Sequence, residues 1–337
     1  MKALRAQWIR WILPGTVLLG VLFVLALWRG GLLGLPAPPK DVDAASAGLV
    51  DLAGLGARAS RLERAATRGG DPDSAITVAG RGLARVRSGD LEGGLNQMRA
   101  GLALAPRDLV IGNAFRMAVF DLRRAAFADT AGRMTLAATV PAVIEHEPFA
   151  TFEALRRDHP CREVILQLGL ARVDELLLNP ALEIQAPSSV ESVSLFTSLL
   201  REDPSYVPAL YGRGLNYLHR PLRLVWPEAR KAAPDAASHD IGLCVAIGRR
   251  IGGATPRLVA TLALTLGDAY AKEGHSERAR SWWQVAQNTS RDSSIVASAR
   301  RRFEWRDENV LDQLEAELER NRLDLDHPLS DLSVMWR

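Results

Sequence analysis

The most pronounced pattern along the chain is an apolar run near its start. Residues 11–28 (WILPGTVLLGVLFVLALW) form a stretch of eighteen residues without a charge, flanked by Lys2, Arg5 and Arg10 before it and Arg29 after it. As a helix this run would be about 27 Å long at ~1.5 Å per residue, close to the hydrocarbon thickness of a bilayer. The pattern predicts a transmembrane helix, with a cleaved signal peptide and a buried core helix as the alternatives.

The flanks of the run favour an uncleaved anchor and give its orientation. A signal peptide has a shorter apolar core and a small-x-small cleavage site, and no Ala-x-Ala pattern follows Trp28. Cations are more numerous before the span than after it, so the positive-inside rule places the N-terminus in the cytoplasm. We therefore expect residues 1–29 to anchor the chain in the inner (cell) membrane, with the large domain in the periplasm or another extracytoplasmic space.

Beyond the span the pattern becomes helical almost throughout. Residues 30–45 are rich in Gly and Pro and predict a stiff linker. From Ser46 onward, apolar residues recur on one helical face, and Gly69, Gly70 and Pro72 end that first helix. Residues 46–322 continue as helical stretches separated by short Gly, Pro and Asp breaks, followed by a tail at 323–337. The layout predicts an all-α body and calls for a search for repeats.

Two stretches of this body share one spacing of small and aromatic residues. In residues 75–106 the marked positions are Gly82, Gly89, Gly94, Gly101 and Pro106. In residues 260–289 they are Leu266, Gly267, Tyr270, Gly274, Ala279, Trp283 and Ala286. Both stretches resemble the tetratricopeptide repeat (TPR) family, whose unit of about 34 residues is a pair of helices. A partial third match follows Pro204, with Leu210, Gly214 and Tyr217 at the corresponding places.

The resemblance implies an α-solenoid of stacked helical hairpins with a concave groove formed by the first helix of each pair. Position by position, the groove residues of the three units would be Ile76, Ala79, Leu83, Val86 and Arg87, then Tyr211, Leu215, Leu218 and His219, and finally Leu264, Asp268 and Lys272. Most of these are apolar, so the expected ligand is an amphipathic helix or an extended apolar segment of a partner protein. The alternative is that the chain's own helices fill the groove.

The last part of the chain predicts a cap for the solenoid. Val310, Leu311, Leu314 and Leu318 form one apolar stripe among many charges, as expected of a C-terminal capping helix. The tail that follows ends in the apolar-rich sequence LSVMWR. It would either strap back onto the helices or bind a partner, and strapping is the simpler expectation.

Composition and motifs add little chemistry to this picture. The formal net charge is +3 with 24% charged residues, and no basic stripe studded with aromatics predicts nucleic-acid binding. The six histidines form no zinc motif, and the adjacent residues Ser238, His239 and Asp240 cannot make a catalytic triad. Ser238 or Asp240 is more simply the N-cap of a helix that starts at Ile241. No cofactor is implied.

Cys161 and Cys244 match no Cys-x-x-Cys or zinc spacing. Whether they pair is open, since a periplasmic location would permit a disulfide. Taken together, the sequence predicts a membrane-anchored TPR scaffold that binds other envelope proteins and helps assemble or hold a complex, without catalysis. The alternatives are a permanent structural subunit of a large membrane complex and, less favoured, an enzyme subunit.

Overall fold

The computed structural model describes residues 52–68, 74–130, 142–178, 182–220, 227–251, 255–324 and 330–336, all of which belong to one unit, Val42–Arg337. The predicted membrane span at 11–28 and the linker at 30–45 lie outside these residues. Among the helices that are described, none combines the length and the apolar character needed to cross a membrane.

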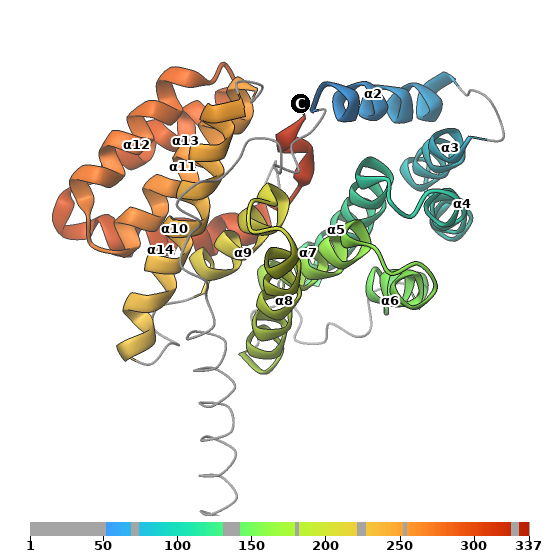
Figure 1. Ribbon diagram of the computed structural model, residues 1–337, viewed down its shortest axis with the longest axis horizontal. Helices are drawn as coiled ribbons and strands as arrows, with labels where there is room; N and C mark the ends of the chain where they lie inside the picture. Colours follow the sequence, from blue (N-terminus) through green and yellow to red (C-terminus); the bar gives the residue numbers. More distant parts are fainter. Residues whose placement is uncertain are drawn as a thin grey trace, which may run out of the picture. The chain divides into compact units, whose positions relative to one another are not determined.

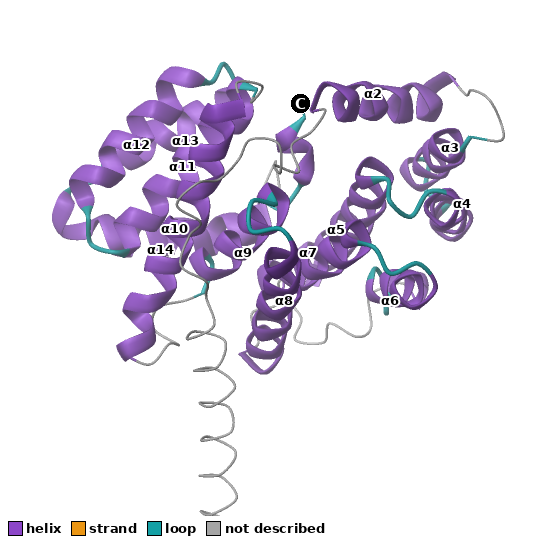
Figure 2. Cartoon of the chain, in the orientation of Figure 1, coloured by secondary structure: helices purple, strands orange, loops and turns teal. Residues whose placement is uncertain are grey.

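The described part of the chain is all-α, and its thirteen α-helices pack as sequential hairpins (Figures 1 and 2). The helices are α2 (Leu52–Arg68), α3 (Ala75–Arg87), α4 (Leu91–Leu104), α5 (Leu109–Thr130), α6 (Phe149–Asp158), α7 (Arg162–Leu178), α8 (Leu182–Glu202), α9 (Val207–Leu218), α10 (Pro227–Ile251), α11 (Pro256–Lys272), α12 (Ser276–Thr289), α13 (Ser293–Phe303) and α14 (Val310–Asp324). Three 3-10 helices accompany them: η3 (Ala142–Ile144), η5 (Asp307–Asn309) and η6 (Leu332–Met335).

Helices α3 and α4 form the first predicted hairpin. The Ser74 hydroxyl caps α3 by accepting a hydrogen bond from the Thr77 amide, and Gly89 adopts a φ of 93° in the turn, a conformation that favours glycine. A Cβ atom placed on Gly82 would lie 2.7 Å from the Gly94 carbonyl oxygen. The two helix backbones therefore touch where both residues are glycine, as the spacing predicts.

Helices α11 and α12 repeat this arrangement. Thr255 caps α11, and Gly274 has a φ of 82° in the turn. The ring of Trp283 lies against Gly267, where a Cβ atom would approach its Cδ1 to 2.5 Å. Ala279 and Ala286, two of the marked positions of this stretch, are fully buried on α12. This hairpin is also confirmed as predicted.

The middle of the body is joined by one aromatic side chain. Phe196 of α8 is fully buried, and its ring faces Gly169 of α7 and Gly212 of α9. A Cβ atom on either glycine would come within 3 Å of the ring, so the absence of a side chain there lets three consecutive helices pack around Phe196. The third predicted unit corresponds to α9 and α10, which meet where Gly214 faces Ile241.

One predicted helix start is wrong. Helix α10 begins at Pro227 and continues through Ser238 and Asp240, so neither residue is the N-cap of a helix from Ile241. Asp240 is instead buried and accepts two hydrogen bonds from the Arg213 guanidinium, at 2.7 and 2.9 Å. Pro227 suits the first position of a helix because a backbone N–H at that position would have no partner within the helix. A buried ion pair thus occupies the position that looked like a cap.

Helix α2, the first described helix, packs against both α3 and α5. Arg58 of α2 pairs with Asp108, whose carboxylate also caps α5 by accepting from the amide of Val110 at 3.0 Å. A Cβ atom on Gly80 of α3 would lie 2.7 Å from Ala65, so α2 and α3 are in close contact. These contacts fix α2 beside both α3 and α5.

The end of the chain folds back onto the helices. Val310 and Leu314 of α14 are buried, whereas Leu311 is 40% exposed, so the apolar stripe is narrower than predicted. Residues 330–336, here called the C-terminal segment, are then buried through Leu332, Met335 and Trp336. The segment lies beside the start of α2, where the Trp336 carbonyl faces Gly56 (Figure 1). The C-terminal segment therefore packs back onto the helices, which is the simpler of the two expectations.

Candidate functional site

The structure separates the predicted groove residues into two groups. Leu83, Val86 and Arg87 of the first hairpin line an open cavity of about 950 Å³. Ile76 and Ala79, from the same helix, pack into the hydrophobic core instead. A volume of this order is in the range of ligand-binding clefts, so the first hairpin carries the candidate site.

The remaining predicted groove residues are used inside the fold. Tyr211, Leu215 and Leu218 of α9 are fully buried in the core, and Leu264 is 9% exposed. His219 directly follows α9, and its Nε2 is buried without a hydrogen-bond partner among the described residues. None of these side chains lines the cavity.

The two charged members of the last unit are bound by later helices. Asp268 accepts hydrogen bonds from Arg302 of α13 at 2.7 Å and from the Trp283 indole at 2.9 Å. Lys272 donates to the Leu218 carbonyl and pairs with Glu315 of α14. The chain's own helices therefore occupy the last unit, which is the alternative that the sequence left open.

The cavity itself lies between α2, α3 and α5, with the C-terminal segment at one end. About half of its lining residues are aliphatic or small, and both α2 and α5 contribute small residues that would let another backbone approach. The lining residues that carry this character are Gly56, Ala59, Leu62, Leu83, Val86, Val110, Ala114, Met117, Ala118 and Leu122.

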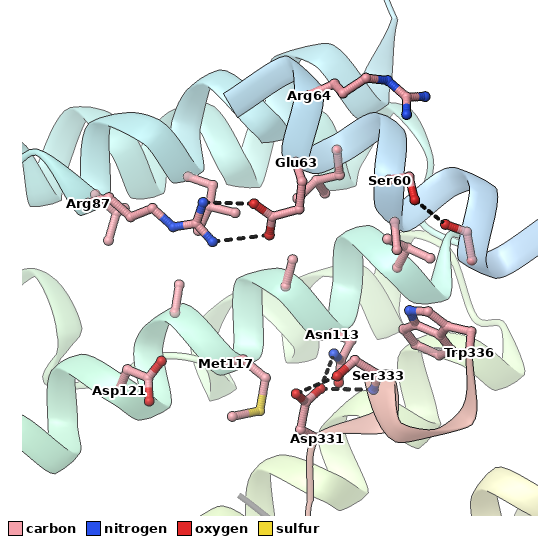
Figure 3. A pocket seen from close by; sticks show the side chains of 18 of the residues that line it. Ser60, Glu63, Arg64, Arg87, Asn113, Met117, Asp121, Asp331, Ser333 and Trp336 are labelled. Atoms are coloured by element: carbon pink, nitrogen blue, oxygen red, sulfur yellow. Dashed lines mark hydrogen bonds and ion pairs between the residues drawn. The ribbon is translucent and has the colours of Figure 1, made fainter. Parts of the chain in front are cut away.

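Charged residues stand at the end of the cavity away from the C-terminal segment. Glu63 of α2 and Arg87 of α3 form a two-bond ion pair at 2.8 and 3.0 Å (Figure 3). Asp121 lies 3.5 Å from Arg124 on α5. Partial desolvation raises the pKa of Asp121 above its usual value, against the opposing effect of Arg124. The exposed Arg64 of α2 is also among the lining residues, and its side chain points away from the Glu63–Arg87 pair (Figure 3).

Polar groups of the C-terminal segment form the opposite end. The Asn113 amide donates to Asp331 at 2.7 Å, and the Asp331 carboxylate also accepts from the Ser333 amide and hydroxyl (Figure 3). The Trp336 side chain lines the wall next to them. The cavity is therefore an aliphatic trough with a polar group at either end.

The sequence interpretation missed the network behind this end. Arg116 is fully buried and donates hydrogen bonds to Gln167, Asp174 and Asn113. Burial raises the pKa of the Asp174 carboxyl, and the neighbouring Arg116 opposes that shift. The available signal was that Asn113 and Arg116 interrupt an otherwise apolar stretch, LVIGNAFRMAVF, at a spacing of one helical turn.

The described residues offer little for metal or acid–base chemistry at this site. They contain no group of three or more His, Cys, Asp or Glu side chains that could hold a metal ion. Cys161 is half-buried and Cys244 is buried, both as free thiols. Glu145 and His146 are exposed, and Glu147 pairs with Arg99 at 2.8 Å. Comparison of the chain with protein-family models, curated proteins and solved structures finds no match.

Proposed function

We propose that this protein is a membrane-anchored, TPR-like scaffold that binds other envelope proteins and helps assemble or hold a complex, without catalysis. The anchor is residues 11–28, with the N-terminus in the cytoplasm and the helical body in the periplasm. Glycines at the crossings of α3 with α4 and of α11 with α12 support the TPR assignment, because small residues at these positions are what the repeat requires.

The observation that carries the proposal is the aliphatic trough between α2, α3 and α5. A cleft with aliphatic and small residues between charged and polar ends suits an amphipathic helix, whose apolar face is read through positions three or four residues apart. Helix α5 supplies Ala114, Met117 and Ala118 at this spacing. An anchored partner would also gain from a raised local concentration at the membrane.

The proposal is tested by site-specific photocrosslinking in native membranes. A photoreactive residue at Ser60, which is exposed and lines the trough, is expected to capture one defined membrane or periplasmic protein. The same probe at Val190, which is 56% exposed on α8, is the matched control and should not capture that protein. Capture of nothing beyond the chain itself would count against a scaffold.

A substitution in the trough gives the second arm of the test. Met117 is half-buried and its side chain points into the trough (Figure 3). Met117→Glu should reduce capture at least fivefold while the helical content measured by circular dichroism is kept, and Val190→Glu should change neither. Leu215 is unsuitable for such a test because it is fully buried, so a charge there would change packing instead of binding.

A further inference from the structure

The C-terminal segment is held in the way that proteins hold a bound peptide. Its hydrogen bonds to the body run through the side chains of Asn113, Arg116 and Asp174. The Asn113 side-chain Oδ1 accepts from the Leu332 amide at 3.0 Å, and the Arg116 guanidinium donates to the Ser330 carbonyl at 2.6 Å. Two main-chain groups of the segment are therefore read by side chains of α5.

The side chains of the segment are recognised as well. The Ser330 hydroxyl donates to the Asp174 carboxylate, and the Asp331 carboxylate accepts from the Asn113 amide at 2.7 Å. Leu332 and Ser330 are fully buried, and Met335 and Trp336 are 2% and 6% exposed. The site thus reads a Ser-Asp-Leu sequence followed by an apolar turn.

The buried charge on the receptor side of this contact stays paired without the segment. Arg116 is bonded to Gln167, Asp174 and Asn113, so its charge keeps a buried counter-ion if the segment leaves. Within the segment, the Val334 amide donates to the Asp331 carbonyl and the Trp336 amide donates to the Ser333 carbonyl, so its turn is self-contained. A preorganised receptor and a self-contained ligand are the features that favour reversible binding.

The bound segment is continuous with the trough. Asp331, Ser333 and Trp336 line its end wall, and Asn113 contributes to both the trough and the segment's site. Departure of the segment would therefore lengthen the trough along α5 toward Asp174.

We infer that Asn113, Arg116 and Asp174 form a peptide-binding site for a Ser-Asp-aliphatic segment, occupied by the chain's own residues 330–336. In this arrangement a partner segment of the same chemistry competes with the internal one and binds across the lengthened trough. The inference deepens the proposed function and rests on it for the competing partner.

The test uses the full chain in detergent with a cleavage sequence for a specific protease placed at residues 325–329. Cleavage leaves the segment held without a covalent link. A fluorescein-labelled peptide with the sequence of residues 329–337 is then added, and its fluorescence anisotropy is followed. We expect the labelled peptide to exchange into the cleaved chain, to be displaced by unlabelled peptide, and to bind the uncleaved chain at least tenfold more weakly.

Two variants address the chemistry of the site. A peptide carrying Asp331→Ala and Leu332→Ala should bind at least tenfold more weakly, and this change cannot affect the folding of the body. Asn113→Ala in the body should weaken binding of the original peptide to a similar extent. Asn288→Ala, at an exposed position of α12, is the matched control and should leave binding unchanged.

Three results would overturn the inference: no exchange of the cleaved segment over days, unfolding of the body on cleavage, or equal binding of the altered and original peptides. The first two would make the segment a structural part of the fold, and the third would show that the site does not recognise the Ser-Asp-aliphatic sequence. Because the assay contains no partner protein, its failure leaves the crosslinking test of the scaffold unaffected, and failure of crosslinking leaves peptide exchange unaffected.

Discussion

Charged side chains inside this fold neutralise one another across helices. Arg302 of α13 lies between Asp268 of α11 and Glu317 of α14, at 2.7 Å from each carboxylate, and all three are nearly fully buried. Removing one member of such a group leaves an uncompensated buried charge, which typically costs about 3–5 kcal/mol. Asp268 therefore contributes to the stability of the last hairpin.

His219 alone should make the free energy of unfolding depend on pH. Burial, together with the nearby Lys272 and Arg302, lowers its pKa from the usual 6.5 to about 3. The unfolded chain then binds a proton near pH 6.5 that the folded chain does not, so the folded state is favoured above pH 6.5 and loses this advantage as the pH falls toward 3. Between pH 7 and pH 5 the loss from this side chain should be about 2 kcal/mol in the free energy of unfolding.

Urea unfolding followed by circular dichroism at the two pH values measures this difference. His219→Gln should reduce the drop between pH 7 and pH 5 by most of that amount, whatever its effect on stability at pH 7. His159→Gln is the control, because His159 is exposed at the end of α6. Equal pH dependence of the wild type and His219→Gln would show that His219 takes up a proton equally easily in both states.

At the scale of a helix pair, the glycines at the α3–α4 crossing make a directional prediction. A Cβ atom on Gly82 would lie 2.7 Å from the Gly94 oxygen and from the Met98 nitrogen, both of which are backbone atoms that cannot move aside. Overpacking of this kind costs about 1–3 kcal/mol. This exceeds the gain of about 1 kcal/mol that alanine brings to a helix. Gly82→Ala should therefore lower the free energy of unfolding.

Gly242 of α10 is the matched control, because a Cβ atom placed there meets no heavy atom within 4 Å. Gly242→Ala should stabilise the protein by about 0.5–1 kcal/mol through helix propensity alone. The measurement is the denaturant midpoint of each variant relative to the wild type. Opposite signs for the two substitutions are expected, and a gain in stability for Gly82→Ala would refute the close approach of α3 and α4.

The elements that the sequence predicted best are those with such local signals. A glycine at a helix crossing and another in the turn are close together in the chain, so the α3–α4 and α11–α12 hairpins were recognisable from residues 75–106 and 260–289. Helices α5 and α7 meet through Arg116, whose partners Gln167 and Asp174 are 51 and 58 positions away. No local spacing encodes a contact of that kind, and the middle of the body was accordingly the least defined.

At the scale of the whole molecule, the candidate site depends on contacts that a local reading does not reach. The first-hairpin residues Leu83, Val86 and Arg87 were predicted from their repeat positions. The end of the trough is made by Asn113 and Asp331, which are 218 positions apart. Burial of Leu332, Met335 and Trp336 accounts for the return of the segment, since each such side chain contributes about 1.5–3 kcal/mol when removed from water.

The membrane anchor is the prediction on which the proposed role of the whole chain depends. An eighteen-residue apolar span should keep the full-length protein in the membrane pellet after a sodium carbonate wash. Replacing Leu19 and Leu22 by Arg should release it, because each Arg at the centre of a span costs about 2.5–3.5 kcal/mol of insertion free energy. Leu32→Arg with Leu33→Arg, just outside the span, adds the same charge and should leave the protein in the pellet.

Orientation is tested on the same preparation. Because Lys2, Arg5 and Arg10 precede the span, a protease added to intact spheroplasts should digest the helical body and spare a cytoplasmic marker protein. Protection of the body until the cells are lysed would reverse the orientation and place the trough among cytoplasmic partners. Recovery of the wild-type protein in the carbonate supernatant would instead show that the anchor prediction is wrong. The membrane would then not raise the local concentration of a partner, as the proposed scaffold requires.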